Sequence, residues 1–166
     1  MANLSDTKDE DWKSAFDLNL MSVIRFTSEF SGPMIDKGWG RILNVTSTLA
    51  KEPSSPMVLS ATMRAGVSAF TKSVSYDLAD KGVTINTICP GGVLTDRLTN
   101  LVQQSSSSQG ISYEEALANS QKSIPIGRFA SVEEFSEIAT FLISDQGGYL
   151  TGISLMADGG LTKGIF

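Results

Sequence analysis

The chain has 166 residues, of which 41% are hydrophobic and 19% are charged, as is usual for one soluble globular domain. A net charge of −5 and the lack of any basic cluster argue against a nucleic-acid-binding surface. No apolar run is long enough to cross a bilayer, so we expect neither a membrane nor a nucleic acid as a partner.

Two residue types restrict the possible chemistry. Histidine is absent, which excludes Ser-His-Asp and Cys-His nucleophile systems and removes the commonest zinc ligand, so we expect no metal site. Cys89 is the only cysteine and lies in an apolar segment, where a buried thiol is the favoured interpretation. A chain without a disulfide is typical of a reducing compartment, and we expect a cytoplasmic protein.

The first predicted helix begins at Thr7, which has the spacing of a capping box with Glu10. Apolar residues recur at helical spacing to about Ile35, and a bend or break is expected near Pro33. Asn19 lies between two leucines in this helix. Either a water-facing side chain or a half-buried, hydrogen-bonded one fits that position.

The central part of the chain predicts a strand over Arg41–Ser47, a helix over about Pro56–Asp80 and a strand over Val83–Cys89. Short connections make this a right-handed βαβ unit with parallel strands. Ligand sites in parallel sheets lie at the carboxyl ends of the strands. Those ends are Ser47 and the Pro90-Gly91 turn.

The remaining segments complete the layer of helices. We expect a short helix over 96–102, a mobile serine-rich stretch over 103–110 and a capped helix over 112–122. The region of about 96–127 could form a lid over a pocket, or be an insertion without function. A helix capped by Ser131 and a last strand over Ile153–Ala157 follow.

Five motifs in this order resemble the C-terminal part of the short-chain dehydrogenase/reductase family, in its 3-oxoacyl-carrier-protein reductase-like branch. They are Asp17–Leu20, Asn44–Ser47, Pro90–Thr95, Pro125–Arg128 and the segment 150–160. The resemblance implies an α/β fold: a partial Rossmann-like, doubly wound parallel sheet with its three C-terminal strands and flanking helices. It also implies a single incomplete domain over 1–166 in which the N-terminal βαβαβ half is absent.

The resemblance also implies roles for individual residues. Ser47 matches the serine that hydrogen-bonds the substrate carbonyl, and Asn19 matches the asparagine that holds a water in the proton relay. Pro90, Gly91 and Thr95 match the segment that lines the nicotinamide. The implied cofactor is NAD or NADP, and the implied substrate is a small carbonyl or alcohol.

The family's Tyr-x-x-x-Lys motif supplies the acid/base tyrosine and the lysine that lowers its pKa. Here the matching positions are Leu59 and Met63, and neither side chain can transfer a proton. A shift of one residue cannot restore the motif, because no Tyr or Lys occurs between residues 53 and 71. Lys72 and Tyr76 lie roughly 20–25 Å further along the helix, too far away to replace them.

Arg64 adjoins these positions. Its guanidinium stays protonated, so it is a poor general acid. It could bind a carboxylate or phosphate, although a surface or interface ion pair is the favoured role.

These observations leave three hypotheses. The first is an NAD(P)-dependent oxidoreductase that is impaired or inactive as this chain alone. The second is a non-catalytic scaffold or interaction subunit, expected to be a homo-oligomer. The third is one half of a split protein, in which a complementing N-terminal half adds a strand to the unpaired edge of Arg41–Ser47.

Overall fold

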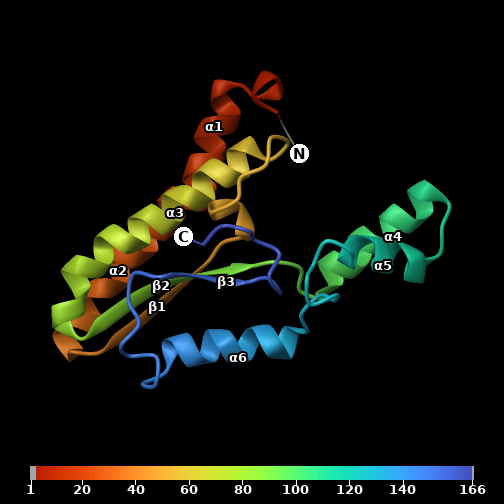
Figure 1. Cartoon of the computed structure of the whole chain (residues 1–166). Helices are drawn as coiled ribbons and strands as arrows, with labels where there is room; N and C mark the ends of the chain where they lie inside the picture. Colours follow the sequence, from red (N-terminus) through yellow and green to blue (C-terminus); the bar gives the residue numbers. More distant parts are fainter. Residues whose placement is uncertain (1–2, 166) are drawn as a thin grey trace.

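The computed structural model describes residues 3–165 and has three layers (Figure 1). A parallel sheet in the order β1-β2-β3 has the helices α1, α2 and α3 on one face and α6 on the other. The helices α4 and α5 extend beyond the carboxyl ends of the strands. The predicted α/β fold, with a partial doubly wound sheet of three parallel strands, is confirmed.

The elements have the following bounds. They are α1 (Asp9–Phe16), the π-helical turn η2 (Asp17–Met21), α2 (Ser22–Lys37), β1 (Gly40–Val45), α3 (Val58–Leu78), β2 (Val83–Pro90), α4 (Asp96–Gln109), α5 (Tyr113–Gln121), α6 (Val132–Ile143) and β3 (Ser154–Ala157). Among residues 3–165, no helix combines the length and the apolar character needed to cross a membrane.

The first helix begins one residue later than the predicted cap implied. Lys8 is the N-cap residue, and its backbone N–H donates a 2.9 Å hydrogen bond to the carboxylate of Asp11. The Thr7 hydroxyl instead donates to the carbonyl of Leu4, at 2.8 Å. The predicted capping box of Thr7 and Glu10 is therefore wrong, because the N-cap residue is Lys8 and the carboxylate that accepts from its N–H is that of Asp11.

Of the two outcomes predicted near Pro33, a break is wrong, because α2 continues through this residue to Lys37, and a bend stays a prediction. A proline inside a helix deprives the carbonyl four residues earlier of its N–H partner. Pro33 and Glu29 are both exposed, so water can hydrate that carbonyl. The irregularity lies further upstream, in the π-helical turn η2 that joins α1 to α2.

The core is built around β2, which pairs with β1 on one side and β3 on the other. Its side chains Val83, Ile85, Ile88 and Cys89 are each 0% exposed, so β2 is covered on both faces. The predicted burial of Cys89 is confirmed. Helix α3 crosses from β1 to β2 and begins two residues after Pro56, which was the predicted start.

A buried hydroxyl connects α3 to both of these strands. Thr71 Oγ1 accepts a 3.0 Å hydrogen bond from Asn44 Nδ2 on β1 and another of 3.0 Å from Thr87 Oγ1 on β2. Thr71 is 0% exposed, so these bonds form away from competing water. They determine which face of α3 points toward the sheet.

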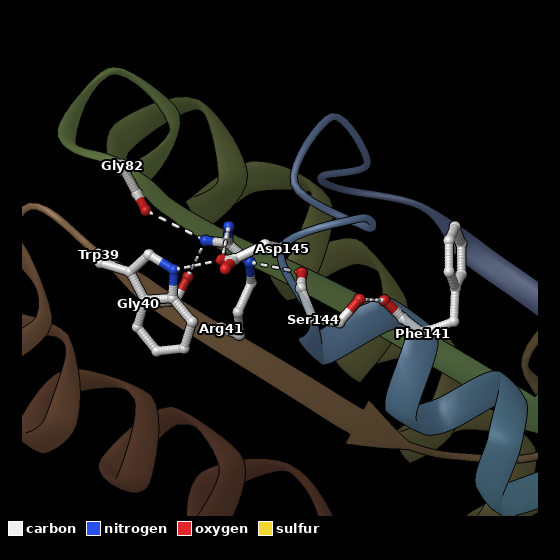
Figure 2. Close-up of polar contacts among 7 residues, drawn as sticks. All are labelled: Trp39, Gly40, Arg41, Gly82, Phe141, Ser144 and Asp145. Carbon is white, nitrogen blue, oxygen red and sulfur yellow. Dashed lines mark hydrogen bonds and ion pairs between the residues drawn. The ribbon is translucent and has the colours of Figure 1, made fainter.

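Arg41 ties the start of β1 to the end of α6, as Figure 2 shows. Its Nε donates to the carbonyl of Ser144 at 3.2 Å, and its Nη1 donates to the carbonyl of Gly82 at 3.3 Å. The guanidinium also lies 4.9 Å from the ring centroid of Trp39, whose Nε1 donates to Asp145 at 2.9 Å. One side chain thus connects three chain segments at the amino ends of the strands.

The serine-rich stretch is helical. Helix α4 runs to Gln109, so both the short helix over 96–102 and the mobile stretch after it are corrected. Ser106 is buried and its hydroxyl donates to the carbonyl of Ile111 at 2.7 Å, while the Ser107 hydroxyl donates to Gln103. These bonds offset the weak helix propensity of serine.

The capping box predicted for the helix that follows Ser131 is confirmed. In helix α6 the Ser131 hydroxyl accepts from the N–H of Glu134 at 3.1 Å, and the Glu134 carboxylate accepts from the N–H of Ser131 at 2.9 Å.

Within residues 3–165, β1 pairs on one side only, with β2. Beside it on α2, Phe26 and Phe30 stack at 6.1 Å and remain 66% and 53% exposed.

Candidate functional site

A cleft of about 480 Å³ opens at the carboxyl ends of β1 and β2. Its walls come from these strand ends, from α3 and from the first turns of α4. Four of the five residues predicted for the site line it together: Ser47, Pro90, Gly91 and Thr95. The placement follows from the parallel pairing, because neighbouring parallel strands end at the same edge of a sheet.

Ser47 presents a hydroxyl group at the end of β1. Its backbone is extended, and its Oγ accepts a 3.3 Å hydrogen bond from the N–H of Leu49 in the turn that follows. A hydroxyl has one proton to donate. Because Oγ is the acceptor in the Leu49 bond, that proton remains available for a carbonyl oxygen in the cleft.

The turn after β2 needs glycine for steric reasons. The N–H of Gly91 donates to the carbonyl of Ala157 at 3.0 Å, and a Cβ on Gly91 would lie 2.9 Å from the Cα of Asp158. Burial of the Asp158 carboxyl by itself raises its pKa, but hydrogen bonds from Thr162 and Gly160 lower that pKa below its ordinary value. The ionised carboxylate therefore holds the segment that supports Gly91.

Thr95 is the N-cap of α4. Its Oγ1 accepts a 3.4 Å hydrogen bond from the N–H of Leu98, which leaves the hydroxyl proton free to be donated. Arg97 lies on the same first turn and also lines the cleft. The amino end of α4 is therefore one wall of the cleft, while the rest of α4 and α5 projects away from the sheet (Figure 1).

On α3, one residue lines the cleft and is hydrogen-bonded to a serine one turn earlier. Arg64 lines the cleft, and its Nε donates a 3.0 Å hydrogen bond to Ser60 Oγ. Thr71, which contacts both strands, lies seven residues beyond Arg64 and eleven beyond Ser60. These separations are about two and three helical turns, so all three side chains share one face of α3.

The structure places Arg64 rather than Met63 at the cleft, while the assignment of Leu59 and Met63 to the tyrosine and lysine positions stays a prediction. Met63 is 6% exposed and does not line the cleft, and Leu59 does not line it either. The loop between β1 and α3 is one residue shorter than the family resemblance leads one to expect, and a register shift of one residue would bring Ser60 and Arg64 to these positions. Such a shift does not restore a Tyr-x-x-x-Lys pair, because the residues that it brings to these positions are serine and arginine.

Asn19 lies outside the cleft lining, on the π-helical turn η2. Its Nδ2 donates a 3.0 Å hydrogen bond to the carbonyl of Ala15, and the side chain is half-buried. Of the two possibilities that the sequence left open, the structure has the hydrogen-bonded one. Its role in a proton relay stays a prediction.

The cleft offers few groups that can transfer a proton. Among the residues that the structure describes, no Tyr, Lys or carboxylic acid lines it. Lys72 and Tyr76 lie further along α3, where the Lys72 ammonium is 5.1 Å from the Tyr76 ring centroid and Tyr76 is 71% exposed. The hydroxyls of Ser47 and Thr95 and the two arginines are the polar side chains that a ligand would meet, together with Thr46 at the end of β1.

Sequence reasoning missed Arg97 and gave Arg64 a minor role. Arg64 is half-buried, and burial lowers the pKa of its guanidinium, with the positive charge of Arg97 as the next cause. Two signals in the sequence could have found them. Arg64 is in helical phase with Thr71, and Arg97 closely follows the strand end at Pro90.

A family model described as enoyl-(acyl carrier protein) reductase matches residues 1–162. Among curated proteins, a 3-oxoacyl-[acyl-carrier-protein] reductase of Haemophilus influenzae is 30% identical over 154 residues, which are 93% of this chain and 59% of that protein. The chain spans less than two thirds of the curated relatives, between 56% and 62% of the length of those compared.

Two solved structures have the same fold. One is an NADPH-dependent reductase involved in bacilysin biosynthesis, which is 30% identical, with a TM-score of 0.90 over 99% of this chain and 63% of that one. The other is a short-chain oxidoreductase from Pseudomonas aeruginosa with an atypical catalytic centre, which is 28% identical, with a TM-score of 0.87 over 98% and 63%.

Proposed function

The chain belongs to the short-chain dehydrogenase/reductase family, with 3-oxoacyl-carrier-protein reductases among its relatives, and from this premise we propose its function. It supplies the substrate side of an NAD(P)-dependent oxidoreductase site for a carbonyl or alcohol. Proton transfer in this site is impaired. The observation that carries the proposal is the cleft that gathers Ser47, Pro90, Gly91 and Thr95 at two strand ends.

The cleft has the groups that hydride transfer requires from this part of a protein. The Ser47 hydroxyl is free to donate to a substrate carbonyl and so to stabilise the oxygen as negative charge develops on it. The Pro90–Thr95 segment is the surface for a nicotinamide ring. The relative whose NADPH dependence is known supports NAD(P) as the cofactor, which supplies the hydride when bound.

The impairment follows from the residues at the tyrosine and lysine positions. A positioned general acid contributes about 10²–10⁴-fold in rate. Ser60 is a far weaker acid than a tyrosine, and its Oγ already accepts a hydrogen bond from Arg64. Arg64 does not release its proton at neutral pH. The related oxidoreductase with an atypical catalytic centre is consistent with chemistry that departs from the family pattern.

The experiment is to measure NAD(P)H oxidation by the protein with ethyl acetoacetate as substrate. We expect slow turnover that is lost in Ser47→Ala and kept in the matched control Ser73→Ala, an exposed serine on α3. Turnover no greater than in buffer, or equal turnover in the two variants, would overturn the proposal.

A second candidate is a non-catalytic interaction subunit. The stacked, exposed Phe26 and Phe30 beside the open edge of β1 favour it, because an apolar patch at an open edge is suited to a partner. The partner would be a second copy of this chain or a complementing N-terminal half that adds a strand. A monomer by analytical ultracentrifugation that also fails to bind the matching N-terminal half would reject this candidate.

The cellular location that suits both candidates is the cytoplasm. Cys89 is a free, buried thiol, as is usual in a reducing compartment. Fusion to a fluorescent protein followed by fractionation tests this location.

A further inference from the structure

The arginines divide into two groups according to their partners. The chain has five arginines. Three of them form ion pairs within residues 3–165: Arg25 with Asp17, Arg41 with Asp145 and Arg128 with Glu134. The other two, Arg64 and Arg97, have no ion pair among these residues, and both line the cleft.

Arg64 is held in place without being neutralised. Its Nε donates to Ser60 Oγ at 3.0 Å, and no other hydrogen bond of its guanidinium occurs among the described residues. The terminal nitrogens Nη1 and Nη2 therefore keep their N–H donors, which have the fork geometry that suits a planar oxyanion. The side chain is half-buried, so its charge is poorly screened by water.

The two positive charges are close enough to act on each other, and Arg97 helps to lower the pKa of Arg64. Like charges that share a cleft without a counter-ion raise its energy. Asp96 is the nearest acid in the sequence to Arg97, but it is exposed and forms no ion pair in the described part of the chain. A bound anion would remove this repulsion.

The rest of the wall is rich in donors. The amino end of α4 begins at Thr95, and the partial positive charge of a helix amino terminus favours an anion. The hydroxyl protons of Ser47 and Thr95 are not used in the bonds described above. Both arginines and both hydroxyls line the same cleft and keep donors that a ligand could use.

We propose that Arg64 and Arg97 bind an oxyanion group, a carboxylate or phosphate, on the molecule that occupies this cleft. The inference deepens the proposed function and rests on it in one respect only: the anion belongs to the carbonyl or alcohol substrate. A short keto acid or a phosphorylated carbonyl compound has the required chemistry. Arg64 is then a residue of the cleft that determines substrate specificity.

The first test is binding of simple anions to the protein, measured by isothermal titration calorimetry. The probes are acetoacetate, inorganic phosphate and pyrophosphate. Arg64→Gln and Arg97→Gln are each expected to weaken binding about tenfold or more, since each removes charge-assisted hydrogen bonds. The matched control is Arg25→Gln, because Arg25 is an exposed arginine outside the cleft, and binding should be unchanged.

The three probes distinguish the sources of the anion. Binding of acetoacetate indicates a substrate carboxylate, and binding of inorganic phosphate indicates a substrate phosphate. Binding of pyrophosphate alone would assign the arginines to the cofactor and overturn the proposal. Equal affinities in wild type, Arg64→Gln and Arg97→Gln, with unchanged circular dichroism spectra, would also overturn it.

A second measurement separates this inference from the proposed function. KM for acetoacetate is compared with KM for its neutral ester, ethyl acetoacetate, in wild type and Arg97→Gln. We expect a rise of about tenfold for the acid alone. Equal rises for both substrates reject the anion site while the oxidoreductase stands. Anion binding without turnover of either substrate rejects the oxidoreductase while the site stands.

Discussion

Ser60 and Arg64 are joined across one turn of α3 by a 3.0 Å hydrogen bond, and Arg64 rather than its predecessor Met63 lines the cleft. Met63, one position earlier, is 6% exposed. Met63→Lys should therefore lower the free energy of unfolding by about 3–5 kcal/mol, the usual cost of an uncompensated buried charge. The matched variant Arg64→Lys should change it by less than about 1 kcal/mol.

Urea denaturation followed by circular dichroism measures both variants. Equal losses of stability, or a larger loss for Arg64→Lys, would show that the faces of α3 have been assigned wrongly. The comparison needs no catalytic activity.

Arg41 should be more important for stability than its ion-pair partner. Arg41→Met leaves the carbonyls of Ser144 and Gly82 without a side-chain donor, and we expect a loss of about 2–3 kcal/mol. Asp145 is 81% exposed and 3.7 Å from the guanidinium, so Asp145→Asn should cost less than about 1 kcal/mol. Thermal unfolding of the two variants checks the order, and a larger effect of Asp145→Asn would contradict it.

Removal of the Thr71 hydroxyl should lower the free energy of unfolding, although the group is small. Thr71→Val keeps the shape of the side chain but removes the acceptor for two donors, the half-buried Asn44 and the fully buried Thr87. The expected loss is about 1–3 kcal/mol, measured by chemical denaturation. Thr62→Val, on the exposed side of the same helix, is the control and should be nearly neutral. A neutral Thr71→Val would mean that these donors find other partners.

Glu134 gives the protein a pH-dependent increment of stability. Hydrogen bonds from Arg128 and from the N–H of Ser131 lower the pKa of Glu134 from its ordinary 4.5 to about 2. A pKa that is lower in the folded state stabilises the fold above pH 4.5, and the benefit disappears as the pH falls toward 2. Glu134→Gln should lack this increment, so its melting temperature should fall less steeply than that of wild type between these values.

Acid titration of the melting temperature tests this prediction. Glu133→Gln, at the adjacent exposed position on α6, is the control and should follow the wild-type curve. Parallel curves for wild type and Glu134→Gln would refute the assignment.

The periodic and capped segments were predictable because their signals are local. The nearly continuous apolar run of β2 and the Ser131–Glu134 capping box are examples. The second half of helix α4 was missed because Ser106 is stabilised by a carbonyl beyond the helix end and by burial, which propensity does not include. The pairing of the arginines was also beyond sequence reasoning, since Arg41 and Asp145 are 104 positions apart in the chain and meet only after folding.

The π-helical turn at Asp17–Met21 has a consequence for how the chain tolerates insertions and deletions. A π turn spans one residue more than an α turn, so the turn is equivalent to a single-residue insertion that the helix has absorbed locally. One residue adds a rotation of about 100°, and the apolar stripes of α1 and α2 are therefore out of phase by that angle. Because the extra residue is taken up within the turn, loss of one residue here should convert the turn to ordinary α-helix and leave the packed faces of α1 and α2 unchanged.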